Sequence, residues 1–402
     1  MAAGPLLYLS NGNIPSRWAH TVQTLKMSEA LATLTPQFEL VIGATLRDAR
    51  APRVDLWRWY GVERPFRVTA LPLWLWRRSP LFTSVREWRF SWAAPRYAAR
   101  KRSALVWTRS YPIASACLTR GLPVIFERHS ASPAKWGRAL REIGAAPSLR
   151  AFIANSEELR AAHVAAGIPD EKFAAFANGV APALLATQRG DARAARRALG
   201  LPEHARIAIY AGSLSAEKGL PTLLAAAAQL PDVRFIVLGG SEADVSRWRR
   251  EAGANVALRG FVPNAQLASW FAAADVGLFP NSARDPLATS TSPLKVLEYV
   301  AAGLPVVATA IPAVTSWLRD GETAYLAPPD DGAAFAAAIA RALREPAAAA
   351  ACAARARTEN VRFTWRDRAQ QILARFAPEL LEREPTAAPS RSLGAPGRSA
   401  PR

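Results

Sequence analysis

The stretch that decides the fold is TSPLKVLEYVAAGLPVVAT, residues 291–309. A Ser-Pro pair precedes an apolar helical pattern, and Gly-Leu-Pro then leads into a short apolar strand pattern. We predict that Ser292 is the N-cap and that Pro293 is the first helical residue, where the missing N–H of proline costs nothing. The free amides of Leu294 and Lys295 would then form an anion site suited to a phosphate.

Lys295 and Glu298 are the two charged residues of this helix pattern. A cation near a helix N-terminus opposes the helix dipole by about 0.3–1 kcal/mol, and a bound anion would explain its position. Glu298 lies one turn further along, where a carboxylate can accept hydrogen bonds from two neighbouring ribose hydroxyls. The alternative is a surface Lys–Glu pair worth a few tenths of a kcal/mol. This stretch alone does not decide between the two.

A second loop, YAGSLSAEKGLPTLL at residues 210–224, favours the anion site. Gly212 and Ser213 follow a predicted strand, and Lys218 directly precedes the next helix pattern. Small residues let the backbone approach a ligand, and Lys218 can reach a diphosphate as a point charge. Neither half contains GxGxxG followed by an acid about 20 residues on, which argues against a nicotinamide dehydrogenase.

The chain has 402 residues, a length that suggests two domains. Strand and helix patterns alternate through two successive series, which predicts two doubly wound α/β domains in a row. Ligands of such sheets bind at the carboxyl ends of the strands, so we expect the site in the cleft between the domains. Neither a spanning apolar run nor a basic leader is recognisable, and Cys117 and Cys352 lie far apart without His partners, so we expect a cytoplasmic protein without a metal site.

Positive charge is concentrated in residues 47–102, which hold fourteen Lys or Arg, four acids and six of the thirteen Trp. A basic surface with Trp can bind an anionic membrane or nucleic acid. An Arg-rich composition with most Trp in the core explains the same counts equally well. We expect no nucleic acid as partner, and leave open whether the membrane or the composition accounts for this window.

Motifs in both halves of the chain resemble those of a known protein family. The second half resembles the donor-binding half of the retaining glycosyltransferases of family 4 (glycosyl transferases group 1) through GSLSAEKG, FIVLGG, VALRGFV, AADVGLFPNS, SPLKVLEYVAAGLPVVAT and DGETAYLAPPDD. The first half resembles it less strongly through NIPSRWAHTVQTLKMSEALA, PVIFERHS and FIANSEELRAAHVAAGIPDEKFAAFANGV, and FTWRDRAQ resembles a helix that crosses back. The similarity covers about residues 5–380 and implies the GT-B fold, two Rossmann-like domains facing across a cleft.

The resemblance also implies a division of the chain. We expect an acceptor domain, a nucleotide-sugar donor domain, a crossover helix that returns to the first domain and a disordered tail, at residues 1–182, 183–362, 363–383 and 384–402. The tail is rich in Pro, Ser, Ala, Gly and Arg without periodicity, as disordered segments are.

On the donor side the resemblance assigns a role to each motif residue. Lys218 and the Gly212-Ser213 backbone hold the diphosphate, together with Lys295 and the helix start formed by Ser292, Pro293 and Leu294. Glu298 binds the ribose hydroxyls, and Gly260, Phe261 and Val262 contact the base.

On the acceptor side the resemblance places His129 at the reacting sugar and Asn11-Gly12 along the cleft. We expect His129, Lys218 and Glu298 to be the catalytic residues. His20 begins the first helix pattern near the same cleft and joins the acceptor-side residues. For a lone His after a strand, a structural hydrogen bond is the alternative to a role in the site.

Three departures from the family pattern are visible. Ser290 stands where the family has the first of two glutamates, Ser213 where a basic residue often follows the Gly, and Ala181 where NGVD usually ends. Lys295 can replace the missing basic charge. Asp285, the acid in the loop before the helix, is a candidate substitute for the missing glutamate.

The resemblance implies a metal-independent hexosyltransferase without a cofactor that uses a nucleotide sugar, a UDP- or GDP-sugar, with retention of configuration. We expect a lipid-linked or cell-envelope glycan as acceptor, at the inner face of the cell membrane. A nucleotide-sugar epimerase and a non-catalytic protein of the same fold remain alternatives. The base, the sugar, the acceptor, the linkage and the oligomeric state do not follow from the sequence.

Overall fold

The computed structural model describes eight stretches of the chain: residues 4–16, 19–44, 55–73, 80–129, 133–187, 192–286, 288–289 and 293–381. Ser290 and Ser292 lie outside them, as do five of the fourteen basic residues and two of the six Trp of the 47–102 window, and the tail from residue 384.

The first half of the described chain folds around a parallel sheet with the strand order β3-β2-β1-β4-β5-β6-β7. Its strands are β1 (Leu6–Ser10), β2 (Phe38–Ala44), β3 (Val68–Pro72), β4 (Leu105–Thr108), β5 (Val124–Arg128), β6 (Leu149–Ala154) and β7 (Phe173–Ala175). The helices of this half are α1 (Ala19–Leu34), α2 (Leu56–Tyr60), α3 (Pro80–Arg100), α4 (Tyr111–Leu118), α5 (Pro133–Ala145), α6 (Glu157–Ala165) and α7 (Pro182–Leu185).

The second half repeats the architecture with a parallel sheet of order β10-β9-β8-β11-β12-β13. Its strands are β8 (Arg206–Ala211), β9 (Val233–Leu238), β10 (Val256–Gly260), β11 (Val276–Phe279), β12 (Val306–Thr309) and β13 (Tyr325–Ala327). Its helices are α8 (Ala192–Ala198), α9 (Leu220–Ala228), α10 (Glu242–Arg249), η2 (Asn264–Gln266), α11 (Leu267–Ala273), α12 (Leu294–Ala301), α13 (Pro312–Thr315), α14 (Gly332–Arg344) and α15 (Pro346–Asn360).

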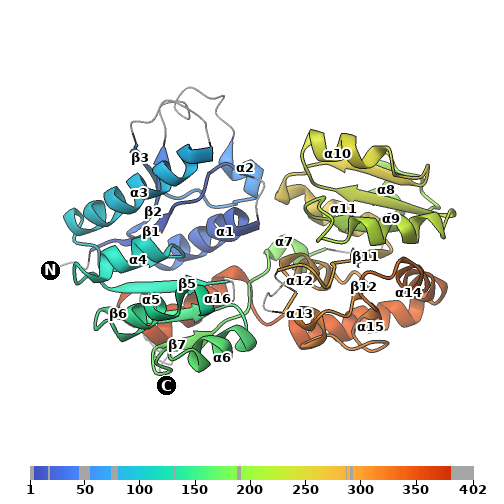
Figure 1. Ribbon diagram of the computed structural model, residues 1–402. Helices are drawn as coiled ribbons and strands as arrows, with labels where there is room; N and C mark the ends of the chain where they lie inside the picture. Colours follow the sequence, from blue (N-terminus) through green and yellow to red (C-terminus); the bar gives the residue numbers. More distant parts are fainter. Residues whose placement is uncertain are drawn as a thin grey trace, which may run out of the picture.

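Each sheet is buried on both faces. Along β1, Leu6 and Tyr8 belong to one apolar cluster, whereas Leu7 and Leu9 belong to another. This alternation follows from the two-residue period of a strand, which sends neighbouring side chains to opposite faces. It explains why the strands read as continuous apolar runs in the sequence, as parallel strands covered by helices do. The predicted pair of doubly wound domains is confirmed (Figure 1).

The last long helix, α16 (Trp365–Phe376), packs beside α1 of the first half, and the short η3 (Pro378–Leu380) follows it (Figure 1). Thr364 and Asp367 form a capping box at its start, which satisfies two of the unpaired backbone donors there. Trp365, Ala369 and Ile372 are buried in the same cluster as Leu6 and Tyr8. The predicted crossing of a C-terminal helix back to the first half is therefore confirmed.

The decisive helix α12 begins one residue later than the sequence predicts. Pro293 is the N-cap, with φ −69° and ψ 102°, and Leu294 is the first helical residue. The prediction that Pro293 is the first helical residue is wrong, because its ψ is extended rather than helical. The amides of Leu294 and Lys295 are still the first two of the helix, so they have no acceptor within it.

Helix α3 carries exposed large apolar side chains on one face. Val85, Trp88 and Trp92 are 41%, 69% and 57% exposed, and their spacing of three and four residues places them along one stripe. Across the described residues, the helices are too short or too polar to traverse a lipid bilayer.

Candidate functional site

The donor-side residues meet at the carboxyl ends of β8 and β11, beside the start of α12. Gly212 and Ser213 follow β8 directly, and the Ser213 carbonyl accepts a hydrogen bond from the Tyr210 hydroxyl at 2.7 Å. Gly219, the N-cap of α9 at φ 78°, lies so close to Pro280 that a Cβ there would collide with the Pro280 carbonyl. Glycine is required at this position, because the αL backbone and the close approach both exclude a side chain.

Lys218 is held by an acid that the sequence offered for another role. Its Nζ lies 2.6 Å from Oδ2 of Asp285, and the Asn281 side-chain amide donates to the same oxygen at 2.7 Å. Asp285 is buried, whereas the Lys218 side chain is 27% exposed. In the structure the Asp285 carboxylate therefore anchors Lys218, whose side chain remains partly exposed at the candidate site.

Lys295 lies behind the loop that contains Gly212 and Ser213. Its Nζ is 3.1 Å from the Tyr210 hydroxyl and 4.2 Å from the centre of the Tyr210 ring. A Cβ on Gly212 would collide with this Nζ, so the glycine makes room for the ammonium. Burial, with the neighbouring charge of Lys218, lowers the pKa of Lys295 to about 7. A buried cation beside a second cation is unfavourable by itself, and a bound diphosphate would compensate for both.

Glu298 lies further along α12, at the boundary between the two halves. Burial raises the pKa of its carboxyl to about 7, against the effects of Asn264, Lys26 and Lys295. The Asn264 amide donates to Oε1 over 3.5 Å. Lys26 comes from α1 of the first half, where its ammonium binds the Gly61 carbonyl and lies 3.7 Å from Glu29. Lys26 was not identified as a site residue from the sequence, because a single lysine within a helix pattern gives no signal of a partner in the other half.

The loop after β10, which contains Phe261 and Val262, contacts the first half. Gly260 ends β10 at φ 69°, and Phe261 follows it. The Phe261 ring stacks on Trp59 of α2, with centroids 4.7 Å apart and planes inclined by 21°. Val262 packs against the core of the second half. The sequence did not indicate this aromatic pair, because the two rings come from different domains.

His129 follows β5 and belongs to a buried polar cluster that the sequence did not reveal. Its Nε2 lies 2.6 Å from Oε1 of Glu127, and Arg368 of α16 donates to the same oxygen at 2.7 Å. The Trp107 indole donates to Oε2 of Glu127 at 2.8 Å. Burial and the nearby Arg109 lower the pKa of His129 to about 4, so its ring is neutral at physiological pH.

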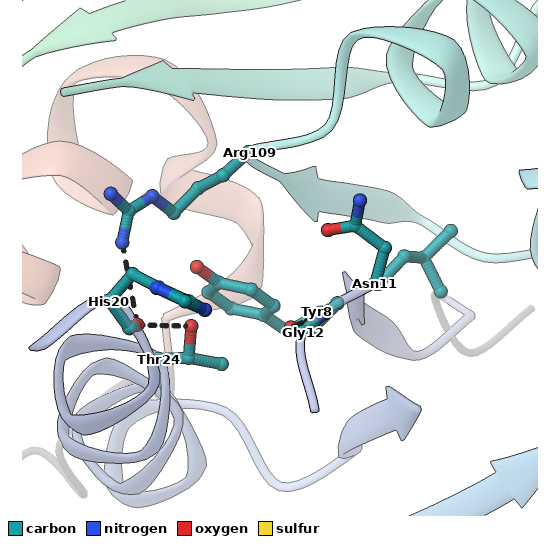
Figure 2. A pocket seen from close by; sticks show the side chains of 8 residues that line it. Tyr8, Asn11, Gly12, His20, Thr24 and Arg109 are labelled. Atoms are coloured by element: carbon teal, nitrogen blue, oxygen red, sulfur yellow. Dashed lines mark hydrogen bonds between the residues drawn. The ribbon is translucent and has the colours of Figure 1, made fainter. Parts of the chain in front are cut away.

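Three predicted acceptor-side residues come together in one cavity. Asn11, Gly12 and His20 line a hollow of about 170 Å³ with Tyr8, Leu9, Ser10, Thr24 and Arg109 (Figure 2). Arg109 follows β4 and donates to the Gln23 side chain at 2.8 Å. Burial, with the charge of Arg109, lowers the pKa of His20. Arg109 was not predicted, although its place after a strand was the available signal.

Two residues predicted at the helix start, and one further histidine, remain to be placed. Ser292 lies outside the described residues, whereas Leu294 packs against the core of the first half, at the domain boundary. His163 is fully buried, and its Nδ1 lies 2.7 Å from the Leu159 carbonyl oxygen, so it has a structural place away from the site. Within the described stretches, no three His, Cys, Asp or Glu side chains gather as metal ligands would.

Part of the second half matches a known family model. Residues 205–345 match the family model of the glycosyl transferases group 1. A D-inositol 3-phosphate glycosyltransferase of Mycolicibacterium paratuberculosis is 34% identical over 203 residues, 48% of this chain and 45% of that protein. One from Catenulispora acidiphila is 29% identical over 64% of this chain and 66% of its own. The chain thus spans about half the length of the first of these relatives.

Solved structures share the whole fold. HepE of Anabaena, solved with UDP and glucose, has a TM-score of 0.70 at 18% identity, over 92% of this chain and 98% of its own. The sucrose-phosphate synthase of Thermosynechococcus elongatus has a TM-score of 0.73 at 22% identity, over 92% and 97%. At these identities the likeness shows the fold alone.

Proposed function

We propose that this chain, whose residues 205–345 form a glycosyl transferases group 1 domain, transfers a hexosyl group from a nucleotide sugar to a glycan acceptor. The observation that carries the proposal is the meeting of Lys218, Lys295 and the start of α12 at the carboxyl ends of parallel strands. Two cations and free helix amides at one point favour a diphosphate. Glu298 completes the site with an acceptor for ribose hydroxyls.

Catalysis follows from the same charges. As the bond between the sugar and the diphosphate breaks, negative charge develops on the leaving phosphate. Lys218, Lys295 and the α12 amides are already oriented there, so they stabilise the transition state without reorganising. These cations can serve without a metal ion. Metal independence and retention of configuration are part of the proposal, and the resemblance to the family supports them.

A UDP-sugar or a GDP-sugar is the proposed donor. The solved HepE structure contains UDP and glucose, which favours UDP for a chain of the same fold. His129 and the cavity around Asn11, Gly12 and His20 lie on the opposite, first-half side and would receive the sugar and its acceptor. Arg109 gives this cavity a positive charge that suits an acceptor with a phosphate group.

The acceptor is proposed to be a lipid-linked or cell-envelope glycan, used at the cytoplasmic face of the membrane. The stripe of Val85, Trp88 and Trp92 on α3 supports this, because exposed Trp beside Arg is typical of surfaces that enter the lipid headgroup region. The Arg96 guanidinium lies 3.7 Å from the centre of the Trp92 ring, so cation and aromatic group occupy one patch. Anionic lipid would attract that patch.

The test is thermal-shift binding of UDP, GDP, ADP, CMP and their sugars to wild type, Lys218→Ala and Glu298→Ala. A ligand at about 100 times its dissociation constant stabilises the fold by about 2.7 kcal/mol. We expect one nucleoside diphosphate to shift the wild-type transition and neither variant to respond. Lys101→Ala, at an exposed position of the first half, is the matched control. No shift with any nucleotide would refute the proposal, and binding without turnover over a broad acceptor panel would favour a non-catalytic protein.

A further inference from the structure

We propose that Arg368 and Glu127 are positioning residues for His129, and that they present its ring to the sugar with Nδ1 as a hydrogen-bond acceptor. The inference rests on the proposed function, because it specifies how the first half meets the transferred sugar. Arg368 lies on α16, 241 residues after Glu127 in the chain, so the crossing helix supplies a part of the first half's site.

The geometry of the cluster fixes its hydrogen atoms. Three donors converge on one carboxylate: His129 and Arg368 on Oε1 of Glu127, and Trp107 on Oε2. A guanidinium and an indole N–H can only donate, so Glu127 serves them best as an ionised acceptor. Burial alone would raise the pKa of Glu127, but Arg368 and His129 hold it well below its usual range.

An ionised Glu127 determines the form of His129. A carboxylate 2.6 Å from Nε2 must accept, so Nε2 carries the hydrogen atom. The ring is neutral, because burial, Arg109 and Arg368 lower the pKa of His129 more than Glu127 raises it. A neutral ring with hydrogen on Nε2 has its lone pair on Nδ1. His129 can therefore accept a hydrogen bond from a sugar hydroxyl, but it is not a proton donor through Nδ1.

Arg368 is itself fixed in place. Its side chain is fully buried, its Nε donates to the Ala177 carbonyl at 3.0 Å, and its Nη1 lies 3.6 Å from the Met27 sulfur. If the guanidinium is removed, Glu127 loses its permanent counter-charge, and the proton it then needs can come to reside on His129. Arg366 lies two residues away on the same helix, is exposed and donates only weakly to Gln370 at 3.4 Å, which makes it the matched control.

The experiment is nitrogen-15 NMR of the histidine rings in the full chain, for wild type, Arg368→Met, Arg368→Lys and Arg366→Met. The chain has four His, so the spectra can be assigned by substitution. In wild type and Arg366→Met we expect His129 as the neutral form with hydrogen on Nε2, titrating near pH 4. In Arg368→Met its midpoint should rise by about one pH unit, the low end of the effect of one nearby charge, because burial and Arg109 lower the pKa of His129 more than Arg368 does.

The accompanying kinetic result should separate positioning from folding. For Arg368→Lys we expect kcat to fall by roughly tenfold or more with the donor KM within about twofold, as when a supporting shell is loosened. A wild-type His129 with hydrogen on Nδ1, or one that titrates near its ordinary value, overturns the inference even if no variant folds. Equal His129 titrations in Arg368→Met and Arg366→Met also overturn it. The NMR measurements need no donor nucleotide. They can therefore fail while nucleotide binding succeeds, or succeed while nucleotide binding fails.

Discussion

The buried ammonium of Lys295 should make the affinity for UDP, the proposed donor nucleotide, dependent on pH. Its pKa is about 7 in the unliganded protein, because burial and Lys218 disfavour the charged form. Each charge of a diphosphate within about 4 Å is worth roughly 4 kcal/mol at an effective dielectric constant of 20. That is enough to raise the pKa of Lys295 by about two units or more on binding, since one unit corresponds to about 1.4 kcal/mol.

The sign and the size of the effect follow. The bound state holds its proton up to about pH 9, whereas the free state loses it above about pH 7, so affinity falls as pH rises between the two values. From pH 7 to pH 8.5 the association constant of UDP should fall roughly tenfold, and at pH 8 binding should take up close to one proton. The β-phosphate of UDP is largely ionised across this range, whereas Glu298, with a pKa of about 7, is about half ionised at pH 7. The contribution of Lys295 is therefore the part of the slope that Lys295→Met removes.

The assay is isothermal titration calorimetry of UDP in two buffers of different ionisation enthalpy, from pH 7 to pH 8.5. Lys295→Met should bind about fiftyfold more weakly than wild type at pH 7 but only about fourfold more weakly at pH 8.5, and it should lack the proton uptake that Lys295 contributes. Lys101→Met, at an exposed position directly after α3, should keep the wild-type dependence of UDP affinity on pH. A wild-type affinity that is flat over this range, or a slope that persists in Lys295→Met, would refute the reasoning.

Three further predictions concern other parts of the molecule. Asp285→Asn removes the carboxylate 2.6 Å from Lys218, so UDP should bind roughly tenfold more weakly, and Asp330→Asn, an exposed control, should leave calorimetric affinity unchanged. The pair Trp88→Ser and Trp92→Ser should reduce co-sedimentation with phosphatidylglycerol vesicles at low salt without altering UDP affinity, and equal sedimentation of wild type and variant would contradict the membrane proposal. Arg196→Met removes the Nη2 donor that lies 2.9 Å from both carboxylate oxygens of Asp275, whose side chain is 35% exposed, and should cost about 1.5–3 kcal/mol in the free energy of unfolding by urea, whereas exposed Arg193→Met should cost less than about 0.5 kcal/mol.

Local sequence patterns predict the structure of the second half. The run from residue 291 to 309 contains a helix start, a lone Lys, a lone Glu and a buried strand, and each feature depends on neighbours in the sequence. Strand and helix periods then predict a parallel sheet, and a parallel sheet places its loops at one edge. For the same reason the sequence predicts that Lys218 lies beside α12.

The incorrect prediction at Pro293 shows that local sequence patterns do not fix the first residue of a helix. Both the N-cap and the first helical position accept a proline φ near −65°, and only ψ separates them. The sequence contains no signal for ψ at that residue, so the start of the helix was misplaced by one position.

The fold class and the loops that follow β8 and β11 can be predicted from the sequence, because these arise from periodicity and from residues close together in the chain. The partners of the charged groups become visible only in the folded structure. Asp285 binds Lys218, Arg368 reaches Glu127 from the last long helix, and Lys26 approaches Glu298 from the first. Such pairs join residues up to hundreds of positions apart, and their ionisation depends on burial. Burial and long-range proximity exist only once both halves have packed.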